Sequence, residues 1–132
     1  MGFTSHDQAA VNQDKYPVDL ETYAHGIRLF NEGKFFDAHE VLEDVWRAAP
    51  AKQKKFLQGL IQLAVALHHH SRGNKVGALS LLKRAGRNLT AEPRECRGIR
   101  VSDLLHSIDE CAAAIERGMA LPSLPRLHEP EC

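Results

Sequence analysis

The sequence has few cysteines and no surplus of either charge, and each shortage excludes a class of protein. Its three cysteines, Cys96, Cys111 and Cys132, are odd in number, widely spaced and without a CxxC pair. This pattern argues against a disulfide framework and against a thiolate zinc site. Seventeen basic residues balance seventeen acidic residues, so no net field favours nucleic acid or an anionic membrane as a partner.

Long apolar runs are also missing. The apolar run LIQLAVAL at residues 60–67 is interrupted by Gln62 and is too short to span a bilayer. The N-terminal stretch MGFTSHDQAAVNQDK is polar and lacks the apolar core of a secretory signal. We therefore expect a cytoplasmic protein without membrane contact. The hydrophobic share of 43% is enough to bury one core in a single domain.

Apolar residues recur at helical spacing from Val18 onward, and glycine or proline separates the periodic stretches. The pattern predicts an all-α fold, a compact five-helix bundle. GIRV at 98–101 is interpreted as an extended connector that leads to a cap residue, Ser102. The proline-containing ending LPSLPRLHEPEC should lie extended over the bundle. The predicted helices cover residues 20–31, 35–48, 51–71, 74–89 and 102–117, within a helical domain at 18–127 that is flanked by tails at 1–17 and 128–132.

The chain resembles itself at a shift of forty residues. This alignment superposes Gly33 on Gly73 and Ala38 on Ala78. In both halves a glycine ends one helix and a small alanine lets the next helix pack closely. The two halves therefore predict two tetratricopeptide-like helical hairpins, and a chance match of helix-ending residues is the alternative.

His39 stands out in FFDAHEVLEDVW, because an imidazole lies there at the edge of the apolar arc of an amphipathic helix. Glu43 follows four residues later, so the imidazole and the carboxylate share a flank and can interact. Glu40 should point outward. Trp46 lies on the apolar arc, where packing in the core or against a pocket wall is the expected role.

The following helix, FLQGLIQLAVALHHH, is apolar around most of its circumference except for a narrow polar stripe. Gln58, Gln62 and His69 form this stripe, and the histidines on either side of His69 should point elsewhere because successive helical residues diverge. Consecutive helices of a bundle lie side by side. We therefore expect the stripe to face His39 and Glu43 and to form one polar cluster with them.

This predicted polar cluster allows three interpretations. In the first, its side chains satisfy one another and fix how the helices pack. In the second, they act without a metal, either in acid–base chemistry or as the lining of a pocket for a small molecule. In the third, His39, Glu43 and His69 hold a divalent metal with an open position that activates water. The spacing HExxE differs from HExxH, and glutamine is a poor ligand for such metals, so the sequence weighs against the third interpretation.

Two longer segments, FNEGKFFDAHEVLEDVWR and FLQGLIQLAVALHHHSRGNKVGALSLLKRAGRNL, together resemble the prokaryotic domain of unknown function 309 family. The resemblance covers about residues 20–125, including GIRV and the closing LPRL. It implies a compact all-helical fold in bacterial, archaeal and plastid-lineage proteins, and no established activity. The signature that the resemblance implies here consists of Phe30, Asn31, Phe35, Ala38, His39, Glu40, Leu42, Glu43, Trp46, Gln58, Gly59, Gln62 and Ala78.

The sequence therefore predicts a bacterial protein that binds a small molecule or a protein partner through the polar cluster. A homodimer is considered as well. The alternative is a metal-binding protein or metal-dependent hydrolase that uses His39 and Glu43. No catalytic residue is assigned, and a divalent metal is the one cofactor considered. The basic stretch around Lys83 and Arg87 has no interleaved aromatics and no phosphate-binding glycine loop. A solvated basic face is therefore favoured over a nucleic-acid site.

Overall fold

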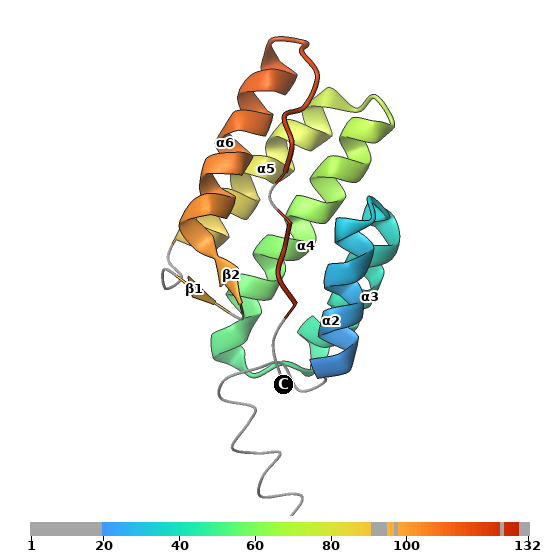
Figure 1. Ribbon diagram of the computed structural model, residues 1–132, viewed down its shortest axis with the longest axis vertical. Coiled ribbons are helices and arrows are strands. Elements are labelled where there is room, and N and C mark those ends of the chain that lie inside the picture. The colour runs from blue at the N-terminus through green and yellow to red at the C-terminus, as the bar shows by residue number, and fades with distance from the viewer. Residues whose placement is uncertain (1–19, 91–94, 97, 125, 130–132) are drawn as a thin grey trace, which may run out of the picture.

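The computed structural model describes residues 20–90, 95–96, 98–124 and 126–129. Within these residues the chain forms five helices and one pair of short strands, which confirms the predicted all-α bundle. Every predicted helix end lies within one residue of the observed end. The helices, shown in Figure 1, are α2 (Leu20–Asn31), α3 (Phe35–Ala48), α4 (Ala51–Ser71), α5 (Lys75–Thr90) and α6 (Val101–Glu116).

Gly33 and Gly73 reverse the chain after α2 and after α4. Their φ angles are 82° and 80°, a left-handed conformation that glycine adopts without the steric cost of a Cβ atom. In each turn the residue after the glycine donates its N–H to the carbonyl five residues earlier, over 2.9 Å and 2.8 Å. These bonds satisfy carbonyls that the helix ends leave open. Gly33 and Gly73, which the repeat superposes, therefore end a helix with the same backbone conformation in both hairpins.

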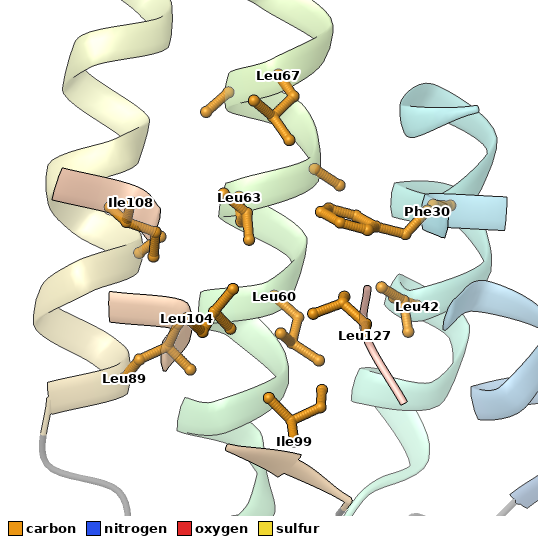
Figure 2. Close-up of a cluster of buried hydrophobic side chains, with 14 of the residues drawn as sticks. Phe30, Leu42, Leu60, Leu63, Leu67, Leu89, Ile99, Leu104, Ile108 and Leu127 are labelled. Atoms are coloured by element: carbon orange, nitrogen blue, oxygen red, sulfur yellow. The ribbon is translucent and has the colours of Figure 1, made fainter. Parts of the chain in front are cut away.

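Helix α4 lies at the centre of the bundle, between α3 on one side and α5 on the other (Figure 1). Leu60, Leu63 and Leu67 of α4 meet side chains from all the other described helices, as Figure 2 shows. Each of these leucines is at most 2% exposed. Burying such a side chain stabilises the fold by about 1.5 to 3 kcal/mol, so α4 is the element on which the bundle depends most.

The segment before α6 forms a short hairpin. Strand β1 (Glu95–Cys96) pairs antiparallel with strand β2 (Ile99–Arg100). Within the GIRV connector, Ile99 and Arg100 are extended as predicted, whereas Gly98 lies in a turn with a φ of 81° and Val101 already begins α6. Ile99 is 3% exposed. The prediction that Ser102 caps α6 is wrong, because Arg100 is the N-cap and no side-chain hydrogen bond caps this helix. Strand pairing holds the backbone extended up to Arg100, which places the helix start one residue earlier.

The segment after α6 runs back along the bundle as an extended chain, shown in dark red in Figure 1. The side chain of Asn31 holds it at the end of α2. Asn31 Nδ2 donates to the carbonyl of Leu127 over 2.7 Å, and the Leu127 N–H donates to Asn31 Oδ1 over 2.9 Å. Leu127 is 3% exposed, and Glu129 forms a 3.0 Å ion pair with Arg28. We call this contact the Asn31 clasp.

Three sequence-based expectations are not tested by the fold. The tail predicted at 1–17 lies outside the described residues. The domain limits and the tetratricopeptide-like character of the hairpins stay predictions. None of the helices among the described residues combines the length and apolar character needed to cross a bilayer.

Candidate functional site

His39 and Glu43 lie one turn apart on α3, and the structure brings them together. His39 Nε2 is 3.6 Å from Glu43 Oε2, and the two side chains are 17% and 41% exposed. The other ring nitrogen, Nδ1, lies 3.0 Å from the carbonyl oxygen of Phe36. Arg47, one further turn along, is 3.7 Å from the second oxygen of Glu43. The imidazole is therefore held by its own helix on both sides.

A half-exposed phenylalanine lies between imidazoles from two helices. The Phe36 ring centroid is 5.0 Å from that of His39 on α3 and 5.1 Å from that of His68 on α4. We call Phe36, His39 and His68 the ring cluster. The expectation that His68 points away from this region is wrong, because His68 is the imidazole that reaches α3. The i, i+3 spacing of Phe36 and His39 signals that contact in the sequence, whereas the His68 contact depends on how α4 is turned.

The polar stripe of α4 does not close onto His39 and Glu43. Gln62 Oε1 accepts a 2.7 Å hydrogen bond from Asn88 Nδ2 on α5. Gln58 is exposed. His69 Nδ1 lies 3.2 Å from Asn74 Nδ2, in the turn before α5. Helix α4 has neighbours on both sides, and its rotation in the bundle turns Gln62 and His69 toward α5. The predicted five-residue cluster is therefore divided between two surfaces.

Trp46 and Glu40 occupy the places that the helical wheel gave them. Trp46 packs against the core, and Lys54 Nζ lies 4.3 Å from the centre of its ring, a distance typical of a cation–π contact. Lys54 also donates to the Trp46 carbonyl. Within the described residues the buried indole N–H of Trp46 has no hydrogen-bond partner. Glu40 is exposed, one turn after Phe36, so it lies at the edge of the ring cluster.

Metal-ligating and thiol groups are dispersed. Among the described residues, no three His, Cys, Asp or Glu side chains come close enough to hold a metal ion. His69 faces Asn74, away from the His39–Glu43 pair with which it was expected to share a metal. Cys111 is buried in the core, and this burial, followed by the nearby charge of Glu110, raises the pKa of its thiol. Its thiolate form is therefore disfavoured.

The exposed side of α3 is acidic. This helix contains Asp37, Glu40, Glu43 and Asp44 but one basic residue, Arg47. Arg47 contacts both Asp44, at 2.6 Å, and Glu43, at 3.7 Å. Within the described residues no ion pair involves Asp37 or Glu40, and both are exposed. The ring cluster thus lies beside carboxylates whose charge is only partly compensated.

These features define the class of the protein as a small helical bundle that presents a ring cluster on an acidic helix. Residues 23–81 match the family model of a domain of unknown function, DUF309. This match confirms the family resemblance over residues 23–81, a range that includes the whole of α3 and α4 and the first part of α5.

Two bacterial relatives are similar to parts of the chain. One is the uncharacterized protein YpuF of Bacillus subtilis (strain 168), 40% identical over 82 residues, which are 58% of this chain and 47% of that protein. The other is an uncharacterized protein of Aquifex aeolicus (strain VF5), 33% identical over 90 residues, which are 67% of this chain and 27% of that protein. The chain thus spans less than half the length of these relatives. Neither the family description nor the two names states an activity, so no function is established by them.

Proposed function

We propose that the protein binds a protein partner through the ring cluster of α3 and α4. The partner is a segment that carries an apolar side chain next to a lysine or arginine. The observation that carries this proposal is Phe36, an aromatic side chain that is 47% exposed and lies between two imidazoles. Aromatic anchors of this kind supply a large share of the energy of protein interfaces.

The side chains around Phe36 hold its ring in an ordered position before a partner binds. His39 and His68 contact its ring at 5.0 Å and 5.1 Å, and His39 is itself held by Glu43 and by the Phe36 carbonyl. A side chain that is already ordered loses less conformational entropy when a partner covers it. The polar contacts of His39 therefore support an ordered aromatic surface, which combines the structural and the binding interpretations of the predicted cluster.

The charge of α3 supports a basic partner. Glu40 and Glu43 flank the ring cluster, and Asp37 adds a third carboxylate on the exposed side of the helix. A cation that approaches this surface gains Coulomb attraction, and an arginine can also lie against the Phe36 ring. A second copy of the chain does not suit this surface, because two acidic helices would face each other and repel.

Matched peptides test the proposal. The probe is a labelled peptide of alternating leucine and arginine, compared with one of alternating leucine and glutamate, and fluorescence polarisation measures binding at low salt. We expect the basic peptide to bind more tightly, Phe36→Ala to weaken it about tenfold, as expected for an interface anchor, and Glu40→Gln to weaken it less. Because α6 is also acidic, Glu110→Gln is the matched control and should leave the affinity unchanged.

Three outcomes contradict a protein-binding ring cluster. The first is equal binding of the two peptides. The second is an unchanged affinity in Phe36→Ala when circular dichroism shows that the variant is folded. The third concerns the metal alternative: calorimetry with Zn²⁺ that shows one ion bound per chain, lost in His39→Ala, would support the metal interpretation instead.

A further inference from the structure

Helices α5 and α6 enclose a groove with an apolar floor. Its volume is about 430 Å³. Gly86 is one of its lining residues, and a methyl group built there would meet no atom within 4 Å outside its own helix backbone. The groove is therefore open where Gly86 has no side chain. The described contacts between α5 and α6 are sparser than those between α5 and α4. The floor is formed by Leu82, Gly86, Leu105, Ile108 and Ala112.

The two sides of the groove carry opposite charges. Lys83 and Arg87 line the α5 side, and Asp109 lines the α6 side. Within the described residues no ion pair links these groups. The same contrast extends along both helices. Helix α5 has four basic residues and no acidic one, whereas α6 has four acidic residues and no lysine or arginine.

Exposed apolar surface continues the groove along α5. Val76 is 79% exposed and precedes Lys83 by seven residues, which places the two side chains on the same side of the helix. On α6, Glu116 follows Asp109 by seven residues and extends the acidic side in the same way. The surface therefore has an apolar centre between a basic edge and an acidic edge.

We propose that this groove is the interface with a second copy of the chain, in which α5 of each copy lies over α6 of the other. A twofold axis parallel to the helices produces this arrangement, because it exchanges the two sides of the groove. Each basic edge then faces an acidic edge, so the surface is complementary to itself, as a twofold interface requires. A twofold axis across the helices would place α5 on α5 and bring like charges together.

The size of the surface indicates a reversible dimer. Each helix has 16 residues and is therefore about 24 Å long. Two such helices packed about 10 Å apart offer a footprint on the order of 500 Å² per copy. That footprint lies at the lower end of specific interfaces. We expect dissociation in the micromolar range and weaker association at high salt.

Charge reversal on the full-length chain tests the dimer. One variant combines Lys83→Glu with Arg87→Glu, and a second carries Asp109→Lys, at the acidic residue that lines the same part of the groove. Each variant alone places like charges across the interface, whereas their mixture restores opposite charges at both contacts. Sedimentation velocity should show a wild-type dimer, at least tenfold weaker dimerisation of each variant, and dimerisation restored in the equimolar mixture. Native mass spectrometry should show that the restored dimer contains one copy of each variant.

Two controls separate a specific interface from a general charge effect. Arg84→Glu reverses one charge on α5 at a residue that does not line the groove, and it should leave the dimer intact. Gly86→Leu fills the groove without changing any charge, and it should abolish dimerisation even if a charge-reversed variant fails to fold. Phe36→Ala should also leave the dimer intact, which separates this interface from the ring cluster.

Three results would overturn the proposal. A wild-type chain that is monomeric up to about millimolar concentration, the weak limit of specific association, excludes the dimer. A mixture of the two reversed variants that stays monomeric excludes the exchange of α5 and α6. Species larger than a dimer indicate a head-to-tail contact between different surfaces.

Discussion

The α2–α3 and α4–α5 hairpins share a buried framework and differ on their surfaces. Forty residues apart, Leu42 and Leu82 are 0% and 1% exposed, and the alanines one turn before them are both fully buried. At two adjacent outward positions the charge is inverted, because Glu43 and Asp44 correspond to Lys83 and Arg84 in the second hairpin. The shared positions therefore specify how a helix packs, and the divergent positions specify what it can contact.

One pair of corresponding positions differs strongly in side-chain volume. Trp46 in α3 corresponds to Gly86 in α5. The indole of Trp46 fills the space beside its helix and supports Lys54, whereas Gly86 leaves that space empty. The missing side chain at Gly86 therefore contributes to the open space beside α5.

The largest expected effect concerns the shared framework. Leu42→Ala and Leu82→Ala should each lower the free energy of unfolding by about 2 to 5 kcal/mol, since each removes a buried side chain and leaves a cavity. Leu82→Ala should lower the free energy of unfolding less than Leu42→Ala does. Leu82 borders the groove, so its neighbours are less constrained and can move into the cavity that the substitution leaves. Urea unfolding monitored by circular dichroism measures both. A larger loss of stability in Leu82→Ala than in Leu42→Ala would contradict the expected relaxation of the side chains beside the groove.

Gly→Ala substitutions should raise or lower the stability of the fold, depending on how tightly each glycine is packed. A Cβ atom on Gly59 would lie 2.7 Å from Leu89, and one on Gly26 would lie 2.7 Å from Leu42. Both Gly→Ala changes should therefore destabilise by about 1 to 3 kcal/mol through overpacking. Gly86→Ala is the control, and it should stabilise by about 0.5 to 1 kcal/mol because alanine favours helix and meets no atom there. Thermal unfolding of the three variants tests this order, and destabilisation by Gly86→Ala would contradict an open groove.

The Asn31 clasp distinguishes the first hairpin from the second, where Ser71 occupies the corresponding position. Ser71 donates to a carbonyl of its own helix over 2.6 Å and holds no distant segment. Asn31→Ser should therefore remove both bonds to Leu127 and destabilise by about 1 to 2 kcal/mol. Hydrogen exchange should show faster exchange at the Leu127 amide. Unchanged exchange there would mean that Leu127 is held by packing alone.

The smallest expected effect on stability concerns the N-termini of α3 and α5, the second helix of each hairpin. Asn74 Oδ1 accepts a 2.9 Å bond from the Gly77 N–H and so caps α5, whereas Lys34, its counterpart, makes no side-chain cap on α3. Asn74→Ala should cost about 1 kcal/mol, and Lys34→Asn should gain about 0.5 kcal/mol. Chemical unfolding resolves both changes. A loss of stability in Lys34→Asn would show that the two helix starts differ in geometry as well as in sequence.

The sequence predicted the helices well because their signals are local. Gly33 and Gly73 mark helix ends through backbone conformation, and the i, i+4 spacing of His39 and Glu43 requires no knowledge of the neighbouring helix. The complete polar cluster could not be predicted in the same way. Whether Gln62 faces α3 or Asn88 of α5 depends on the rotation of α4 between its two neighbours, and a helical wheel contains no information on that rotation.

The clasp between Asn31 and Leu127 joins positions that are 96 residues apart, whereas the main helix–helix contacts join consecutive helices. A linear stack of hairpins can fray from either edge, one unit at a time. Here the segment after α6 is hydrogen-bonded to α2, the first described helix, so α2 and α6 are not expected to unfold independently of each other. Because the clasp joins positions 96 residues apart, we expect it to form late in folding and to couple the outer helices into one cooperative unit.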